Sequence, residues 1–483
     1  MNEGKNTVIQ KSMGWSLFSE VAAKFVTPVT NMLLARILVP DDFGVLAICN
    51  MLVSFVDIIT DAGFGKYLVQ ADIKSEEERD QLANVAFWSN LALSVTLYLL
   101  IILNRVRIAT LLGGSEYSTV ICVASIQLIL TSISSIQTGL FRRKFDFKKL
   151  FLARVAVAAV PLLIAVPIAY FTRSYWALII GTLSGALVNS VLLTILSSWR
   201  PRLYYSFEQL KKMFSFSFWS LCEGLANWTI FWFDTFMVTR IYSAYYVGIY
   251  KNSANMVMSI MGMITASMSP VLLSVLSRVR DDPKEYESLY LTIQRIMLYL
   301  VIPMGFGLFF YRGIATHVLF GNQWDEAANV IGAWGLMMMC SIVFYSFPAE
   351  LYKSKGIPKI LFLFQCGYLV FMVPVCLVAV NNGFWTFVYV RCLCVLEQVV
   401  LSLILIRKYF SISPGKVFMN MLKPLLCASS IAATSFLFSF FMHSKLQQFI
   451  AMVLSAGIYF LIVIIFCKDD LLAAKNRIQE AKL

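Results

Sequence analysis

The sequence predicts an all-α integral membrane protein with about fourteen transmembrane helices. Three observations predict this fold. Long apolar segments recur along almost the whole chain, Lys and Arg alternate between the loops that join them, and the two halves match at a fixed offset. Of the 483 residues, 59% are hydrophobic and only 14% are charged, which is unlike the composition of a water-soluble domain.

Each apolar segment is long enough to cross a bilayer. A transmembrane helix needs about 20 apolar residues. Backbone groups in hydrocarbon must be hydrogen-bonded within their own segment, so these segments are expected to be helices. Strands of a membrane barrel would be about ten residues long and would alternate in polarity, which these segments do not. The predicted spans are 14–38, 43–64, 81–104, 117–140, 150–171, 175–198, 214–239, 245–276, 287–311, 325–348, 358–380, 384–406, 419–441 and 446–467.

The basic residues indicate both the number of spans and their orientation. Of the 40 Lys and Arg residues, 28 lie at loops, termini or inner span ends that we assign to the cytoplasm, with Lys359 and Lys423 counted at the inner ends of their spans. On the opposite side there are 7, with Arg36 counted at the outer end of its span. Short loops rich in Lys and Arg stay on the cytoplasmic side. The alternation therefore predicts that both termini are cytoplasmic. It also explains the net charge of +13 by topology and attraction to anionic lipid, without a nucleic-acid partner.

Local signals mark several segment ends. The first segment, 14–38, is too long for a secretory signal peptide. Ser75 and Glu78 predict a capping box at the start of the third helix. Asp282 and Pro283 predict a cap and a first-turn proline for the ninth. Residues 468–483 carry apolar side chains near one face and predict an amphipathic helix on the inner membrane surface.

An offset of 204 residues relates the two halves. Six spans separate the matching positions, so the halves share one orientation, as in a parallel repeat about an axis along the membrane normal. The matching positions are Trp15–Leu17 with Trp219–Leu221, Arg36 with Arg240, and Gly44 with Gly248. The predicted organisation is a six-helix lobe over 1–200, a second over 201–410, two additional transmembrane helices over 411–467 and a cytoplasmic amphipathic tail over 468–483.

Polar residues recur at helical spacing in the first two spans of each half. Steps of three and four residues place each series on one helix face. Charged side chains at membrane depth normally face a bundle interior or water, so these faces predict a water-filled cavity between the halves. The series contain Glu20, Lys24 and Asn31, then Asp57 and Asp61, then Glu223 and Asp234, then Lys251 and Asn255.

Several of these charges also have a purely structural interpretation. Glu20 and Lys24 can pair along one helix and only hold the bundle together. Asp57 and Asp61 are like charges one turn apart, so partner cations are expected, and Lys24 or Lys66 are the candidates.

Other polar and kinked positions leave two interpretations open. Arg154 lies near an inner helix end, where it can extend to the headgroups. Lys251 and Arg391 lie nearer outer ends, where a cavity role and a structural role are both compatible with the sequence. Glu397 is either a partner of one of these cations or a ligand for a coupling ion. Pro28 predicts a bend that serves gating or is only a kink.

Two motifs resemble a known family. Residues 34–44, Leu-Ala-Arg-Ile-Leu-Val-Pro-Asp-Asp-Phe-Gly, resemble the ARxLxPxDFG signature near the start of polysaccharide-export flippases. Residues 61–70 resemble the D-x-G-x-x…LVQ element that follows it. The family is that of the Wzx-type oligosaccharide flippases, within the superfamily of multidrug, lipid and oligosaccharide exporters. Span count and the two six-helix bundles extend the resemblance to the whole chain.

The resemblance implies a transporter of the bacterial plasma membrane. It would move undecaprenyl-pyrophosphate-linked oligosaccharide repeat units to the outer leaflet by alternating access, for assembly of lipopolysaccharide, capsule or exopolysaccharide. Lys24 and Lys251 best match the cations expected to hold the anionic headgroup. A polysaccharide polymerase is a candidate partner, no cofactor is expected, and coupling to Na⁺ or H⁺ stays open. The candidate substrate-binding residues are Lys24, Lys251, Asn31, Asp57, Asn255 and Arg391, and the coupling or gating candidates are Glu20, Pro28, Asp61, Glu223, Asp234 and Glu397.

Three other functions are weighed against this one. An ion-coupled multidrug or organic-cation antiporter of the same superfamily would need a dominant unpaired carboxylate, whereas Lys24 is a deep cation. A membrane glycosyltransferase or polymerase usually carries catalytic residues on a large outer loop, and every predicted outer loop has about a dozen residues or fewer. A scaffold would leave the buried charges unexplained. Neither a phosphate-binding glycine loop nor an ATPase motif occurs, and two histidines cannot build a histidine-rich zinc site.

Overall fold

The computed structural model describes residues 26–468, except 62, 74 and 358, together with Asp470. All regular elements in these residues are helices. The chain divides into two compact units, with the boundary between Lys251 and Asn252. This boundary falls inside a helix, after the seventh predicted span. The assignment of six helices to each of two lobes stays a prediction.

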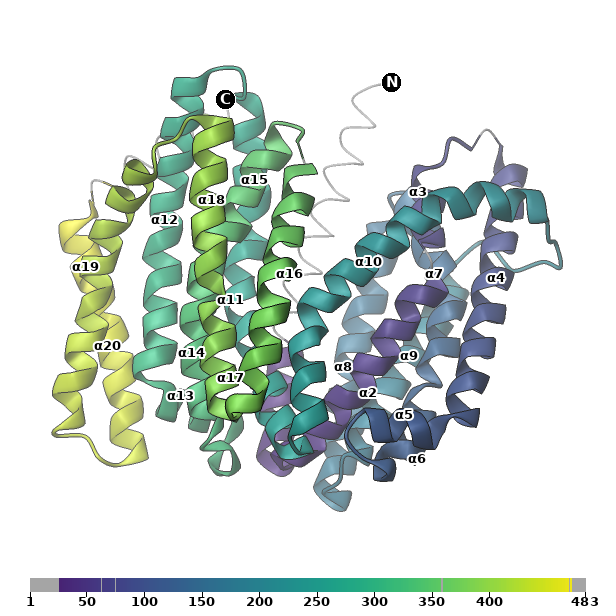
Figure 1. The fold of residues 1–483 in the computed structure, drawn as a ribbon, viewed down its shortest axis with the longest axis horizontal. Helices are drawn as coiled ribbons and strands as arrows, with labels where there is room; N and C mark the ends of the chain where they lie inside the picture. Colours follow the sequence, from purple (N-terminus) through teal and green to yellow (C-terminus); the bar gives the residue numbers. More distant parts are fainter. Residues whose placement is uncertain (1–25, 62, 74, 358, 469, 471–483) are drawn as a thin grey trace. The chain divides into compact units, whose positions relative to one another are not determined.

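The described part of the first unit contains a helix over residues 26–37 and is a bundle of long helices joined by short ones (Figure 1). α8 and α9 pack closely together, α7 contacts α2, α4 and α9, and α10 packs against α2. The elements are α2 (Pro40–Asp61), α3 (Phe64–Gln70), α4 (Glu76–Leu103), α5 (Arg105–Leu111), η1 (Ser115–Tyr117), α6 (Ser118–Ala124), α7 (Gln127–Arg143), α8 (Phe147–Thr172), α9 (Trp176–Leu196), α10 (Phe207–Ile241) and the first turns of α11 (Ala244–Arg278).

The second unit is a bundle in which α12 contacts α14, α19 and α20. The final pair, α19 and α20, lies at the edge of this bundle beside α12 (Figure 1). The elements after α11 are α12 (Pro283–Phe310), α13 (Arg312–Phe320), η2 (Asn322–Trp324), α14 (Ala327–Ser341), η3 (Ile342–Ser346), α15 (Phe347–Ser354), α16 (Lys359–Ala379), η4 (Val380–Asn382), α17 (Phe384–Leu393), α18 (Val395–Phe410), α19 (Pro414–Ser439) and α20 (Lys445–Phe466).

Twelve helical segments of the described residues are long and apolar enough to cross a membrane. The all-α membrane class predicted from the sequence is therefore confirmed, whereas the count of fourteen and the cytoplasmic termini stay predictions. Of the other two predicted spans, 14–38 lies largely outside the described residues. The second, 214–239, lies within α10, a 35-residue helix that is not among the twelve.

Several segment boundaries follow the predicted local signals. The Ser75 side chain accepts a hydrogen bond from the Glu78 backbone N–H at 3.1 Å, which caps α4. The Asp282 side chain accepts from the backbone N–H groups of Lys284 and Glu285, and Pro283 occupies the first turn of α12. Three spans are less regular than predicted. A break at Ser125 and Ile126 divides 117–140 into α6 and α7. A π-helix, η3, interrupts 325–348, and a break at Cys394 divides 384–406 into α17 and α18.

Backbone contact between the first turns of α2 and α11 requires two glycines. A Cβ atom on Gly44 would overlap the carbonyl of Ala244, and one on Gly248 would overlap the carbonyl of Pro40. Pro40 and Ala244 are 204 residues apart, as are Gly44 and Gly248. The contact of Gly44 with Ala244 is therefore repeated by the contact of Gly248 with Pro40, with the two helices exchanged. Such a reciprocal pair of contacts is characteristic of a two-fold interface. Residues that are 204 positions apart in the sequence thus occupy equivalent positions at this crossing.

The last described residue of the second unit, Asp470, joins three helices. Its Oδ1 accepts from Arg295 Nη1 on α12 at 2.8 Å. Its Oδ2 accepts from Lys423 Nζ on α19 at 3.3 Å and from the Tyr299 hydroxyl on α12 at 3.2 Å. Burial acts to raise the pKa of Asp470, but Arg295 and Lys423 outweigh it, so the pKa lies below its ordinary value. The contacts fasten the end of α20 to α12 and α19.

Replacing either crossing glycine by alanine should destabilise the protein by about 1–3 kcal/mol, because the added methyl meets backbone atoms that cannot rotate away. The reciprocal geometry predicts similar losses for Gly44→Ala and Gly248→Ala. The measurement is thermal unfolding of purified protein. Gly262→Ala is the matched control, since a Cβ there meets nothing within 4 Å. A loss at only one of the two positions, or at neither, would contradict the reciprocal contact.

Replacing Asp470 by Asn should destabilise the second unit by about 1 kcal/mol at pH 7, because the two ion pairs are partly exposed. The pKa of Asp470 is lower in the folded protein than in the unfolded chain. Its ionised carboxylate therefore stabilises the fold at a pH above the unfolded pKa. This stabilisation is lost as the pH falls through the lowered pKa of the folded protein. The difference from wild type should therefore shrink below about pH 4. Unfolding temperatures at several pH values measure this, with exposed Asp281→Asn as control. An equal loss of stability in the Asp470 and Asp281 variants would contradict the role of Asp470 in fastening the helices.

Candidate functional site

A ladder of acid–hydroxyl hydrogen bonds joins α2 to α7 inside the first unit. Asp57 Oδ1 accepts from Thr131 Oγ1 at 2.7 Å, and Asp61 Oδ1 accepts from Ser135 Oγ at 2.7 Å. Both pairs are spaced four residues apart, so each series lies on one helix face. The two carboxylates therefore receive hydroxyl donors from α7, where the sequence had suggested cations.

Lys66, one of the suggested cations, pairs instead with Glu223. Lys66 Nζ on α3 lies 3.1 Å from Glu223 Oε2 on α10, and the two side chains are 50% and 58% exposed. One turn further along α10, Trp228 Nε1 donates to Ser54 Oγ on α2 at 3.1 Å. The polar faces of the second and seventh predicted spans thus approach each other within the first unit, and the water-filled cavity between the halves stays a prediction.

Lys251 and Asp234 are buried at the crossing of α10 and α11, with 4% and 2% exposure. Lys251 Nζ donates to the Phe231 carbonyl at 2.7 Å and lies 3.8 Å from the centre of the Phe231 ring. Asp234 Oδ2 accepts from the Tyr250 hydroxyl at 2.9 Å. In this structure Lys251 is therefore held by α10, and it would have to leave these contacts to touch a substrate.

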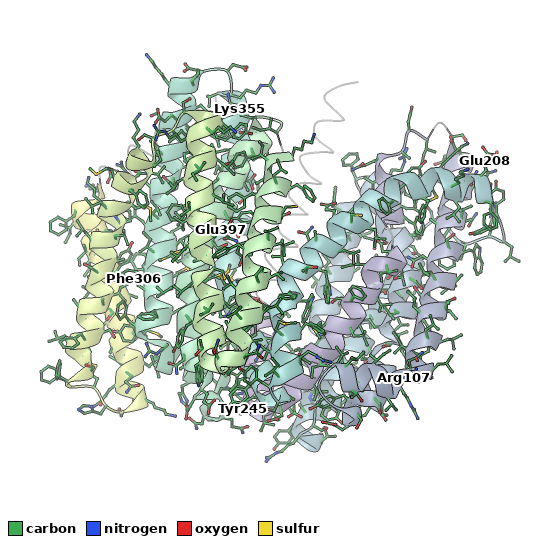
Figure 2. All side chains as sticks on the ribbon, viewed as in Figure 1. Arg107, Glu208, Tyr245, Phe306, Lys355 and Glu397 are labelled. Carbon is green, nitrogen blue, oxygen red and sulfur yellow. The ribbon has the colours of Figure 1, made fainter. Side chains whose placement is uncertain are left out.

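In the second unit, Arg391 and Glu397 have different surroundings. Arg391 is buried, donates to the Tyr368 hydroxyl at 2.7 Å and lies over the Trp334 ring at 5.6 Å. Glu397 is half-buried near the middle of the bundle (Figure 2). Its Oε2 atom is buried and accepts no hydrogen bond within the described residues. Glu397 therefore stays a candidate for proton or ion coupling, whereas Arg391 is packed between aromatic groups.

The remaining predicted site residues belong to the first and eighth predicted spans. Glu20 and Lys24 lie outside the described residues. The helix over 26–37 continues through Pro28, which is buried, and Asn31 follows on the same segment. Asn255 on α11 is half-buried. The substrate-binding and coupling roles of these residues stay predictions.

A cavity of about 610 Å³ lies within the first unit, between residues 26–37, α7, α8 and α9. Among the described residues that line it, Arg142 and Arg154 are the only charged ones. Hydroxyl and amide side chains also line it: Thr27, Thr30, Asn31, Gln127, Thr131, Thr138, Thr182 and Asn189. Sequence reasoning missed this site because it counted Arg142 among the loop charges and favoured an extension of Arg154 to the headgroups. The sequence signal that could have revealed the cavity is the helical spacing of polar residues along α7.

Comparison with known proteins places these features in context. The family described as polysaccharide biosynthesis protein matches residues 33–329. The succinoglycan biosynthesis transport protein ExoT of Rhizobium meliloti is 28% identical over 69% of this chain and 67% of its own length. The lipopolysaccharide biosynthesis protein WzxC of Escherichia coli is 20% identical over 66% of this chain and 64% of its own length. The matched region thus spans about two thirds of these relatives.

Two solved structures share the fold. The lipid II flippase MurJ in an inward closed conformation has a TM-score of 0.77, with 13% identity over 94% of this chain and 98% of that chain. An inward-facing multidrug resistance MATE family transporter has a TM-score of 0.62, with 13% identity over 85% of this chain and 96% of that chain. At this level of identity the likeness concerns the fold.

Reversing one charge of the Lys66–Glu223 pair should destabilise the first unit by up to about 1 kcal/mol, because like charges then meet in a half-exposed site. The double variant Lys66→Glu with Glu223→Lys should recover most of that loss. Thermal unfolding of the two single variants and the double variant measures the coupling. The matched control is Lys212 with Glu208, a more exposed pair within α10. Additive losses in the Lys66–Glu223 cycle would show that the pair does not couple.

Proposed function

Because the chain belongs to the polysaccharide biosynthesis protein family, we propose that it is a flippase for a lipid-linked oligosaccharide in a bacterial plasma membrane. Membership of the family confirms the resemblance found at residues 34–44. The named relatives are a transport protein and other polysaccharide-assembly proteins, which supports a transporter and not an enzyme. The proposed substrate is an undecaprenyl-pyrophosphate-linked repeat unit, carried from the inner to the outer leaflet.

One observation supports this function most directly: a hydrogen-bonded polar surface joins α2 to α7, two helices that lie in segments apolar enough to cross a membrane, and extends to α10. Asp57 and Asp61 on α2 and Glu223 on α10 belong to this surface. Ionisable groups inside transmembrane segments are costly and are retained mainly where polar cargo or ions pass. A surface of this kind is difficult to explain in a protein that only anchors others.

The physical problem of moving such a lipid explains the need for that surface. A pyrophosphate and its sugars lose their hydration in hydrocarbon, and burying an unpaired ion costs many kcal/mol. A polar surface between helices replaces part of the water around the headgroup, while the lipid tail stays in the bilayer. Exposing this surface alternately to the two sides of the membrane would then move the headgroup across.

The roles of individual residues are proposals of the same kind. Lys24 would contact the headgroup, together with Asn31, Asp57 and Asn255. Lys251 and Arg391 would join after release from Phe231 and Tyr368. Glu397 would take up a coupling H⁺ or Na⁺, because its buried Oε2 accepts no hydrogen bond within the described residues.

The antiporter alternative has less support. The MATE transporters share the fold at low identity, which carries no information about substrate. The matching family and the named relatives concern polysaccharide assembly. A drug antiporter would therefore have to be established by its own activity.

Deletion of the gene should cause lipid-linked repeat units to accumulate in the inner leaflet and should abolish the surface glycan. The readouts are extracted lipid-linked sugars, their accessibility to a membrane-impermeant reagent, and surface glycan. Complementation by the wild-type gene is the control, and Lys24→Ala at matched membrane levels tests the headgroup contact. Normal glycan combined with increased drug sensitivity would overturn the flippase in favour of the antiporter.

A further inference from the structure

We propose that the cavity between residues 26–37, α7, α8 and α9 binds a phosphate-linked sugar, with Arg142 and Arg154 as the phosphate ligands. This inference rests on the proposed function and names a loading site for the same substrate class. It assigns the phosphate contacts to α7 and α8, whereas the sequence suggested Lys24 and Lys251.

The charge of the cavity favours an anion. Arg142 and Arg154 line it, and no described carboxylate does. Two guanidinium groups without an acidic neighbour in the same lining suit a phosphate or diphosphate, which accepts several hydrogen bonds at once from planar donors.

Arg142 and Arg154 are exposed, and their bonding differs from that of two neighbouring cations. Arg143 donates to the backbone carbonyls of Leu68 and Ala71, at 2.9 and 2.8 Å, and Lys149 pairs with Asp146 at 3.1 Å. Within the part of the chain that the structure describes, neither Arg142 nor Arg154 has such a hydrogen bond or ion pair. Their donors are available to a ligand in the cavity.

The rest of the lining suits sugar hydroxyl groups. Asn31, Gln127 and Asn189 bring amides, and five threonines bring hydroxyls. Amides and hydroxyls both donate and accept hydrogen bonds, as sugar hydroxyls do. A volume of about 610 Å³ lies within the range typical of small-molecule sites. The cavity therefore combines a cationic part with a neutral polar part, as a sugar phosphate requires.

The positions of the lining residues along α7 and α8 show where the cationic part and the neutral polar part of the cavity lie. On α7, Gln127, Thr131, Thr138 and Arg142 are spaced by 4, 7 and 4 residues and share one face. Arg142 lies in the last turn of α7, and Arg154 lies near the start of α8. Both ends adjoin the loop over 144–146, which the basic residues assign to the cytoplasm. The phosphate would thus be held near the inner leaflet, with the sugars further along α7.

One residue connects this cavity to the acid ladder. Thr131 lines the cavity and donates to Asp57 at 2.7 Å. A ligand that approaches Thr131 therefore approaches the hydroxyl that holds Asp57. The loading site and the polar surface of α2 are adjacent parts of the same unit.

Binding measured on the purified full-length protein tests the assignment. The protein is placed in nanodiscs of zwitterionic lipid and titrated with undecaprenyl diphosphate linked to N-acetylglucosamine. Arg142→Gln and Arg154→Gln should each weaken binding about tenfold, because each removes charge-assisted hydrogen bonds. Lys144→Gln and Lys148→Gln remove the same charge from neighbouring exposed positions outside the lining and should change binding less than twofold.

Two further measurements keep the result decisive. Arg142→Lys and Arg154→Lys conserve charge but lose the planar pair of donors, so they should fold as wild type and still bind more weakly. Titration with phosphatidylglycerol distinguishes a membrane phospholipid from the sugar-linked diphosphate. Binding of phosphatidylglycerol as tight as that of the diphosphate, with the same arginine dependence, would overturn the sugar-phosphate assignment.

The outcome separates this inference from the proposed function. If deletion of the gene causes inner-leaflet accumulation but the glutamine variants bind like wild type, the cavity assignment fails and the flippase remains. If deletion causes no accumulation, the flippase itself fails. Tight wild-type binding that both arginine substitutions weaken supports the cavity.

Discussion

The absence of water inside a bilayer is the constraint on which the rest of this molecule depends. A polar group placed at that depth needs a partner, and two acids of the first unit find theirs on a neighbouring helix. Thr131 and Ser135 of α7 serve Asp57 and Asp61 of α2, with the same four-residue step on both sides. The acids can stay in an apolar helix only because α7 carries hydroxyls in register. The same hydrogen bonds therefore join α2 to α7 and make the surface between them polar.

Two kinds of cation partner follow from the same constraint. Lys251 is held by the Phe231 carbonyl and aromatic ring, and Arg391 by the Tyr368 hydroxyl and the Trp334 ring. These contacts make the two charges part of the helix packing. Arg142 and Arg154, by contrast, line an open volume. The fold thus already supplies partners for Lys251 and Arg391, whereas the donors of Arg142 and Arg154 stay available to a ligand.

The sequence predicted the fold class well because hydropathy, loop charge and capping act locally. Ser75 and Asp282 begin their helices as expected, since a cap depends on only three or four neighbouring residues. The π-helix at Ile342–Ser346 was not predicted, although Pro348 follows it and cannot donate a hydrogen bond to the carbonyl of Phe344. A proline signals a disturbed turn but does not specify which irregular geometry replaces it. Which side chains pair between different helices was harder to predict. Lys66 was suggested for Asp57 or Asp61 and pairs with Glu223, because helix spacing defines a face without defining which helix covers it.

The crossing of Gly44 and Gly248 has a mechanical consequence. At both glycines the atoms nearest to an added Cβ belong to the backbone of the opposite turn. A larger side chain could therefore not be accommodated by a change of rotamer and would push two whole turns apart. The separation of these turns is set by the absence of side chains, and each of the two equivalent positions contributes one glycine to it.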